Sequence, residues 1–171
     1  MPEPDHAQLV IAAQGGDEAA FGELYRRFGR FVHGVVLAQL RSDEAADVTQ
    51  DVFIHAWTTI ASLREPAAFG GWIGAIARRR AIDHLRRRRE ETGTDATAVV
   101  AESQHAAAEA AEALAAIREL PEAYRETLVL RLVEGLTGPE IAALTGLTPD
   151  SVRVNLHRGF KLLRERLGVP S

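Results

Sequence analysis

The segment EGLTGPEIAALTGLTPDSVRVNLHRGFKLLRERL, residues 134–167, decides the fold of the C-terminal part of the chain. Thr137 followed three residues later by Glu140 predicts a capping box at the start of a short helix. Gly146 predicts the end of that helix, and Thr148 predicts the N-cap of a second one. Two helices joined by a turn at a glycine are typical of a helix-turn-helix, so the sequence predicts one here.

The second helix of this motif has two chemically different faces. Its apolar stripe consists of Val152, Leu156, Phe160, Leu163 and Leu167. The opposite face, between Asp150 and Lys161, carries polar and basic side chains that can bind base edges and phosphates in a major groove. This pattern indicates binding to duplex DNA. An ordinary helical hairpin with a solvated basic face is the alternative interpretation, because a motif match is a hypothesis.

A second basic segment, ARRRAIDHLRRRREE, spans residues 77–91 of a chain whose net charge is −4. Its seven arginines repel one another and are not required for folding, so they favour a polyphosphate partner. Arginine also stacks on unpaired bases. Trp72 opens the same predicted helix and Phe69 lies in the loop before it, so the segment also fits a single-strand binding surface. A solvated charged face, with Trp72 in the core, explains the same residues without a ligand.

An acidic segment, residues 42–63, predicts a helix that begins with Ser42 as its N-cap. Asp47 and Asp51 are a like-charge pair four residues apart, which destabilises a helix by a few tenths of a kcal/mol. A docking face for a basic partner explains such a pair. A metal site at Asp47, Asp51 and His55 is a weaker interpretation, because no second cluster of ligands accompanies it. The acidic residues also favour the helix N-terminus by their charge.

The rest of the chain also has a helical pattern, since no segment shows the alternation between hairpin turns that indicates a strand. The sequence therefore predicts an all-α protein of two helical domains joined by a flexible linker. The first domain spans residues 5–91, the linker 92–112 and the second domain 113–168. In the first domain, Asp17 is a predicted N-cap, and residues 64–71 form a loop before a helix that starts at Trp72.

The composition excludes several classes of protein. Cysteine is absent, so the chain has no disulfide, no thiolate metal site and no cysteine nucleophile, which fits a reducing cytosol. We expect no signal peptide and no membrane insertion, because no apolar run approaches the roughly 20 residues that a span needs. Neither a nucleophile with its base nor a phosphate-binding loop is evident, so we expect no enzyme activity and no cofactor.

Taken in order, four segments resemble the conserved regions of the extracytoplasmic-function (ECF) sigma factors of bacterial RNA polymerase. The segments are GDEAAFGELYRRF, DEAADVTQDVFIHAWTTI, FGGWIGAIARRRAIDHLRRRR and LPEAYRETLVLRLVEGLTGPEIAALTGLTPDSVRVNLHRGFKLLRERL. The resemblance implies a dissociable subunit that directs core RNA polymerase to promoters. It implies further that the first domain opens the −10 element and holds flipped bases, and that the second domain binds the −35 element as duplex.

The resemblance also implies a role for individual residues. It implies that Asp47, Gln50 and Asp51 dock on a coiled coil of the beta-prime subunit, while the polymerase beta flap, promoter DNA and an anti-sigma factor are further partners. The residues implied for the −10 element are Arg64, Phe69, Trp72, Arg78, Arg79, Arg80, Asp83, Arg86 and Arg87. Those implied for the −35 element are Thr148, Ser151, Arg153, Val154, His157, Arg158 and Lys161. The family often has ARNLAID where this chain has ARRRAID, so at Arg79 and Arg80 the resemblance does not define the −10 specificity of this chain.

Two other functions fit parts of the sequence. A helix-turn-helix regulator that does not dock on polymerase explains the second domain and leaves the first without a purpose. An adaptor or anti-sigma-like interaction protein would use the helices as grooves and would need no DNA. For the sigma factor we expect that the isolated chain binds promoters poorly, because the linker leaves the two domains unfixed until the polymerase sets their separation.

Overall fold

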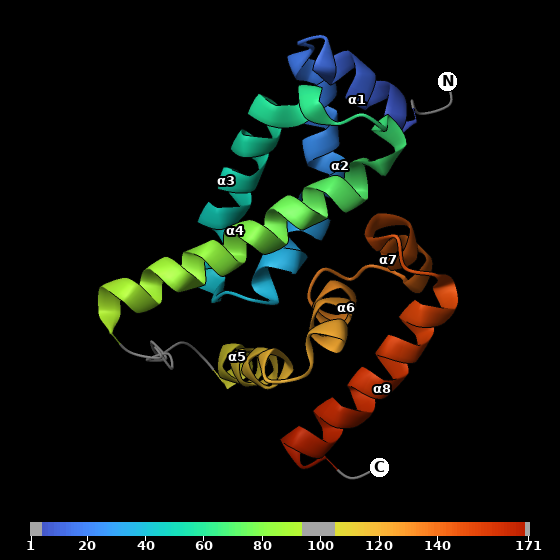
Figure 1. Cartoon of the computed structure of the whole chain (residues 1–171). Coiled ribbons are helices and arrows are strands. Elements are labelled where there is room, and N and C mark those ends of the chain that lie inside the picture. The colour runs from blue at the N-terminus through green and yellow to red at the C-terminus, as the bar shows by residue number, and fades with distance from the viewer. Residues whose placement is uncertain (1–4, 94–104, 170–171) are drawn as a thin grey trace.

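The computed structural model describes residues 5–93 and 105–169, and within these ranges it contains helices and turns but no strand, which confirms the all-α prediction. The α-helices are α1 (His6–Gln14), α2 (Glu18–Leu37), α3 (Ser42–Thr59), α4 (Phe69–Thr92), α5 (His105–Arg118), α6 (Glu122–Leu132), α7 (Gly138–Thr145) and α8 (Pro149–Leu167). Two short 3-10 helices, η1 (Ile60–Ser62) and η2 (Pro66–Ala68), lie between α3 and α4. We call α1–α4 the N-terminal domain and α5–α8 the C-terminal domain (Figure 1).

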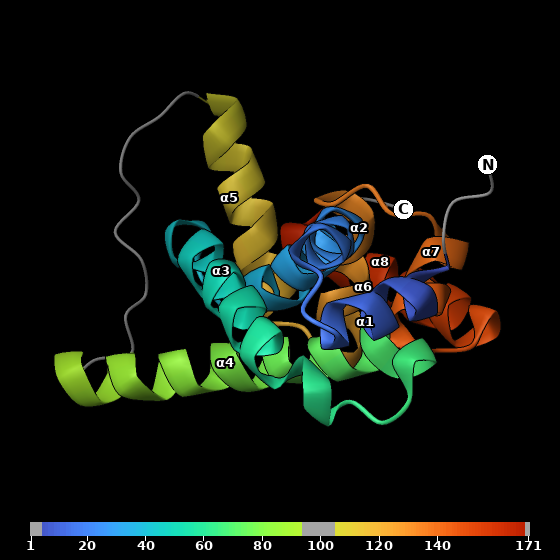
Figure 2. The same cartoon turned by 90° about the horizontal axis from the view of Figure 1, so that it is seen from above.

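The predicted linker falls partly on residues 94–104, which lie outside the described residues. Its last part belongs to α5, which projects from the other helices when the molecule is seen from above (Figure 2). None of the helices in the described ranges combines the length and the apolar composition that a membrane crossing requires.

The central helix of the N-terminal domain is α2, which packs against α1, α3 and α4. Asp17 caps it as predicted, since the side chain accepts a hydrogen bond of 3.0 Å from the Ala20 N–H. The apolar side chains of α2 recur every three or four residues, and Leu24 and Phe31 have no exposed surface. Helix α4 comes close to α2 at Gly74, where an added Cβ would lie 3.1 Å from the Phe31 ring.

Two predicted helix starts are wrong. Helix α4 begins at Phe69 rather than Trp72, because η2 runs directly into it and the following glycines are helical. Gly70 packs against the C-terminal domain, and this tertiary contact outweighs the low helix propensity of glycine. Helix α3 includes Ser42 instead of being capped by it, and the preceding Arg41 makes no side-chain cap. Acidic residues in the first turn stabilise that helix end by their charge.

The predicted helix-turn-helix is formed by α7 and α8, which pack against each other. Thr137 and Glu140 form the capping box, in which the Thr137 N–H donates to the Glu140 carboxylate at 2.7 Å. Gly146 ends α7 in the left-handed conformation, with φ of 76°, and Thr148 caps α8 through the Ser151 N–H.

The apolar stripe of α8 is partly confirmed. Val152 and Leu163 are buried, whereas Leu167 is 36% exposed, because α8 ends there and no further turn continues the packed face. The sequence pattern missed one buried position on this stripe. Gly159 faces Leu128 of α6, and an added Cβ would lie 3.0 Å from the Leu128 side chain.

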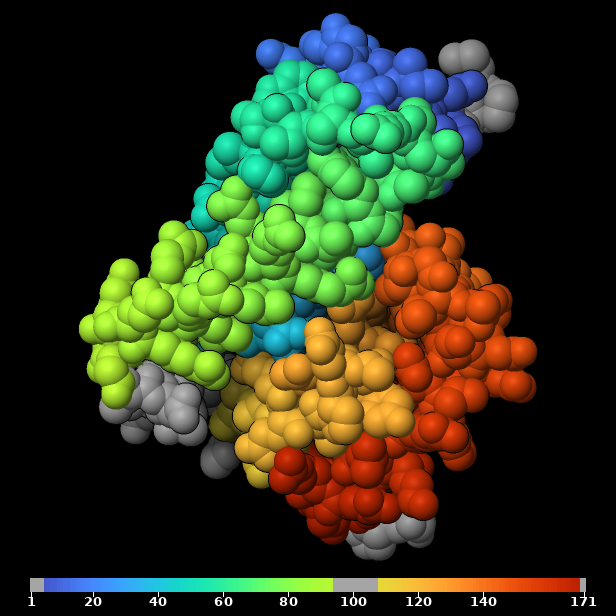
Figure 3. Space-filling model, in the orientation of Figure 1, coloured from blue at the N-terminus to red at the C-terminus, as the bar shows by residue number. Residues whose placement is uncertain are grey.

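The two domains pack against each other and share one apolar core. Helix α6 packs against α2 and α7 against α4, so the C-terminal domain lies along the α2–α4 side of the N-terminal domain (Figures 1 and 3). The α2–α6 contact depends on Gly34, since an added Cβ would lie 2.6 Å from Leu130 and 2.9 Å from Glu134. This packing was not predicted from the sequence. It determines which charged side chains pair across the domain boundary and which stay available to other partners.

Candidate nucleic-acid interface

The arginine-rich helix α4 presents an open pocket on the side that also faces α3. The cavity measures about 490 Å³, and the residues that line it include His55, Trp72, Arg79, Arg80 and Asp83. An indole beside two guanidinium groups fits an unpaired base and its phosphate, because bases stack on aromatic rings and arginine binds phosphate oxygens. Four of the residues predicted for single-stranded DNA are therefore brought together in space.

The remaining predicted residues of this set differ in accessibility. Arg64, Arg86 and Arg87 are exposed on the described surface. Phe69, in contrast, has no exposed surface, and its ring packs edge-on against Phe28 with a centroid distance of 4.9 Å. In this arrangement Phe69 offers no face for stacking on a base.

Arg88, in the arginine run, has a structural partner within the N-terminal domain. Arg88 donates from Nη1 to Glu44 of α3 at 2.9 Å, and the same carboxylate lies 3.1 Å from His84 Nε2. These contacts tie the C-terminal part of α4 to α3. The arginine run is therefore more than a candidate DNA-binding surface, because Arg88 also holds α4 against α3, and the sequence alone did not separate the two uses.

Arg78 points toward the C-terminal domain and binds Glu126 of α6. It donates from Nε to one carboxylate oxygen at 2.9 Å and from Nη2 to the other at 2.6 Å. This bidentate hydrogen bond, together with the charges of Glu126 and Glu122, raises the pKa of Arg78 against the effect of burial. Arg78 is thus the one predicted −10 residue that an ion pair of the described structure engages across the two domains.

The face of α8 predicted for duplex DNA is accessible. Arg153, Val154, His157, Arg158 and Lys161 are exposed. Arg153 pairs with Asp150 one turn earlier, at 3.1 Å, and both side chains are more than three-quarters exposed. A surface pair of this kind contributes little to stability and leaves Arg153 free to exchange partners. Thr148 and Ser151 bond to each other at the helix start, at 2.8 Å.

The acidic face of α3 lies on the surface, away from the apolar stripe that packs on α2 and α4. Asp47, Gln50 and Asp51 are exposed, as a docking face requires. Ile54, one turn after Asp51, is 58% exposed and was missed as a candidate contact. Within the described residues no group of three His, Cys, Asp or Glu side chains is placed to hold a metal ion.

A second charged contact crosses the domain boundary. His33 of α2 lies with Nδ1 2.5 Å from Glu134, which follows α6 and is largely buried. The hydrogen bond and the negative charge of Glu134 raise the pKa of His33 above its ordinary value near 6.5, and partial burial opposes them. Arg30 also approaches this region, since its guanidinium would lie 3.3 Å from a Cβ added at Gly135, next to Glu134.

This pair predicts a pH dependence of stability. Because the pKa of His33 is raised in the folded chain, its contribution is complete below its ordinary value near 6.5 and is lost as the pH rises through the folded-state value. We expect the difference in thermal midpoint between the wild type and His33→Gln to be larger at mildly acidic than at alkaline pH. Differential scanning fluorimetry across this range checks it. A difference that does not change with pH would contradict the prediction.

Comparison with known families matches both domains. Residues 24–91 match the family described as Sigma-70 region 2, and residues 110–163 match Sigma-70, region 4. The matches therefore cover the arginine-rich helix, the acidic helix and the helix-turn-helix.

Relatives of known description align over most of the chain. RNA polymerase sigma factor CarQ of Myxococcus xanthus is 32% identical, over 90% of this chain and 92% of CarQ. ECF RNA polymerase sigma factor RpoE of Cereibacter sphaeroides is 32% identical, over 88% of each. The probable sigma factor RfaY of Xanthomonas campestris pv. campestris is 33% identical over 95% of this chain, which spans only 44% of RfaY.

A solved structure has the same fold. The structure of CnrH in complex with the cytosolic domain of CnrY matches with a TM-score of 0.66 and 24% identity, over 97% of this chain and 99% of that chain. At this level of identity the match establishes the shared arrangement of helices.

Proposed function

Because the chain belongs to the ECF sigma factors of the sigma-70 family, we propose that its separate surfaces divide the work of transcription initiation. The chain is an alternative sigma factor that binds core RNA polymerase and directs initiation at specific promoters. The proposal assigns one surface to the polymerase, one to melted −10 DNA and one to duplex −35 DNA. On this proposal the chain is not an enzyme, needs no cofactor and acts in the cytoplasm, where RNA polymerase transcribes.

The −10 role is carried by the pocket on α4. Trp72, Arg79, Arg80 and Asp83 line one cavity of about 490 Å³, which is large enough for a base. Extruding a base from the duplex costs a few kcal/mol, and stacking in this pocket together with phosphate contacts offsets that cost. Arg64, Arg86 and Arg87 extend the basic surface beyond the pocket, and Arg78 joins it when released from Glu126. Phe69 acts indirectly, by supporting the start of α4 beneath Trp72, whose ring centroid lies 5.7 Å away.

The docking role is carried by the exposed acidic face of α3. Asp47, Gln50 and Asp51 present two carboxylates and an amide to a basic partner. Such a face explains the like-charge pair, which costs the isolated helix a little stability. We propose that it binds the beta-prime coiled coil and that the C-terminal domain contacts the beta flap.

The −35 role is carried by the exposed face of α8. We propose that Arg153, Val154 and His157 meet base edges, while Arg158 and Lys161 bind phosphates, with Thr148 and Ser151 at the helix start. An exposed basic face opposite a buried stripe is what a helix needs to lie in the major groove.

Arg153→Ala is expected to weaken −35 binding by about 1–3 kcal/mol if the guanidinium reads a guanine. The loss should be restricted to promoters with the preferred base, because a base contact carries sequence information and a phosphate contact does not. Quantitative footprinting of the holoenzyme on a matched and a substituted promoter checks this. Lys161→Ala serves as the control and should weaken both promoters to a similar extent. Unchanged affinity in Arg153→Ala would rule out the assignment.

The most direct test of the function is run-off transcription with core polymerase on a library of promoter fragments. We expect the chain to give the polymerase a preference for a subset of them. If no preference appears, the proposed function is wrong. A regulator that does not dock on polymerase would bind duplex DNA alone and would not associate with core polymerase. We also propose an anti-sigma partner, since the solved CnrH structure contains the cytosolic domain of CnrY.

A further inference from the structure

The segment between α3 and α4, residues 60–68, leads into the surface proposed for −10 DNA, and we call it the connecting segment. It contains η1 and η2, and the backbone between them is extended at Leu63 and Glu65. Leu63 and Phe69 are buried, whereas most of the residues between them are exposed. An exposed, extended backbone depends on neighbouring elements for its conformation. The contacts of this segment therefore decide where Arg64 and the start of α4 lie.

The side chain of Gln14, the last residue of α1, holds the first half of the connecting segment. Its Nε2 donates to the Ile60 carbonyl at 3.0 Å and to the Leu63 carbonyl at 2.8 Å. An amide nitrogen carries two protons, so these two hydrogen bonds use both of them. The Leu63 carbonyl belongs to the peptide group that leads into Arg64. Gln14 thus fixes the backbone directly before an arginine proposed to bind DNA.

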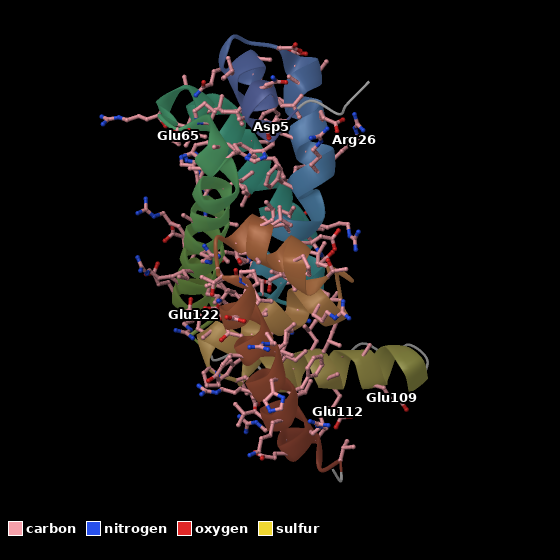
Figure 4. The ribbon with its side chains drawn as sticks, turned by 90° about the vertical axis from the view of Figure 1, so that its right-hand side faces the viewer. Asp5, Arg26, Glu65, Glu109, Glu112 and Glu122 are labelled. Atoms are coloured by element: carbon pink, nitrogen blue, oxygen red, sulfur yellow. The ribbon has the colours of Figure 1, made fainter. Side chains whose placement is uncertain are left out.

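His6, the first residue of α1, holds the second half of the connecting segment. Its Nε2 lies 3.1 Å from the Ala67 carbonyl oxygen, and because a carbonyl oxygen only accepts, Nε2 is the donor. The ring packs edge-on against Phe28 at a centroid distance of 5.9 Å, and Asp5 Oδ1 lies 3.2 Å from its other nitrogen. Figure 4 shows Asp5 and Glu65 at the same end of the molecule. The start of α1 therefore lies against the connecting segment.

From these contacts we propose that Gln14 and His6 are positioning residues, which hold the connecting segment so that Arg64 and Trp72 meet the −10 strand in the correct place. This inference rests on the proposed function. The three hydrogen bonds leave from the two ends of α1, which packs against both η1 and η2, so one helix sets the course of the whole segment. Helix α1 lies before residues 24–91, which match Sigma-70 region 2, so that match assigns it no role.

Four variants separate these hydrogen bonds from the packing around them. Gln14→Met keeps the length and the helix propensity of the side chain but has no N–H donor. Its matched control is Gln8→Met, the same substitution at an exposed position of the same helix. His6→Leu removes the donor to Ala67, and His6→Gln restores an N–H on a side chain of similar reach. Because the His6 side chain is 37% exposed, its variants keep the proposal testable if Gln14→Met fails to fold.

The experiment titrates the holoenzyme of each variant with a fluorescent single strand that carries the −10 element of a promoter selected by run-off transcription. We expect roughly tenfold weaker binding for Gln14→Met, which loses two hydrogen bonds, and a smaller loss for His6→Leu. Gln8→Met and His6→Gln should bind like the wild type. Affinity for core polymerase and for −35 duplex should stay unchanged in all four, which a general loss of structure would not allow. Hydrogen exchange should become faster in residues 60–68 of Gln14→Met and stay unchanged in α2.

Each outcome supports or overturns the positioning role. If Gln14→Met and His6→Leu bind the −10 strand like the wild type, that role is wrong and the proposed function stands. If the affinities for the −10 strand and the −35 duplex fall together, the substitutions act on general stability, and the inference is again wrong. If His6→Gln binds as weakly as His6→Leu, the hydrogen bond to Ala67 does not position the segment. If the wild-type holoenzyme does not prefer the −10 strand over a scrambled one, the proposed −10 role fails and this inference fails with it.

Discussion

Asp51→Arg is expected to weaken binding to core RNA polymerase by roughly a hundredfold, because it places a positive charge on the face proposed to dock on a basic partner surface. Asp51 is exposed on α3 and has no role in the core, so the fold should tolerate the change. The substitution also removes the like-charge pair with Asp47, which slightly favours the helix. Measurement by pull-down of core polymerase and by fluorescence titration gives the affinity directly.

A matched control separates docking from a general effect of charge. Glu109→Arg makes the same change of charge on α5, far in sequence from the acidic face, and should bind core polymerase like the wild type. Circular dichroism should report the same helix content for both variants. If Asp51→Arg retains normal affinity for core polymerase, the acidic face of α3 is not the docking surface.

Phe31→Ala is expected to reduce the free energy of unfolding by about 3–5 kcal/mol. The Phe31 side chain has no exposed surface, and its ring is the nearest atom group to Gly74 of α4. Removing the ring leaves a cavity between α2 and α4, and close-packed helices relax into such a cavity only in part. Urea unfolding followed by far-ultraviolet circular dichroism measures the loss.

The control for this variant is Ile11→Ala, which removes an apolar side chain that is 59% exposed on α1. A surface substitution of this kind usually changes stability by less than about 0.5 kcal/mol. If Phe31→Ala costs no more than Ile11→Ala, the Phe31 ring between α2 and α4 is not central to the core.

The sequence was sufficient for the features that depend on local chemistry. The helix-turn-helix follows from a capping box, a left-handed glycine and a threonine cap. Each of these features involves residues only a few positions apart in the sequence. The two sets of basic residues and the acidic face also follow from spacing along single helices. Residue roles on these surfaces stay predictions until binding is measured.

Apart from the Ser42 cap, what the sequence missed depends on contacts between distant segments. Glu126 and Glu134 have the sequence pattern of ordinary acidic residues, and only the packing of the C-terminal domain on α2 and α4 brings them to Arg78 and His33. The start of α4 at Phe69 has the same origin, because Gly70 lies against the backbone of Leu144 with an added Cβ only 3.0 Å from it. No local signal marks such contacts, although Gly34 in the middle of an apolar helix face was a clue to a close neighbour.

The packing of α8 on α6 has a consequence for how promoter preference diverges among related chains. Gly159 packs directly on Leu128, so a contact that includes none of the proposed DNA-binding residues sets the tilt of α8. A larger residue at position 159, or a smaller one at position 128, would change the orientation of α8. All the side chains on its face proposed for the major groove would then shift together. Promoter preference can therefore change through the packing of α8 on α6 while every residue proposed to contact a base stays the same.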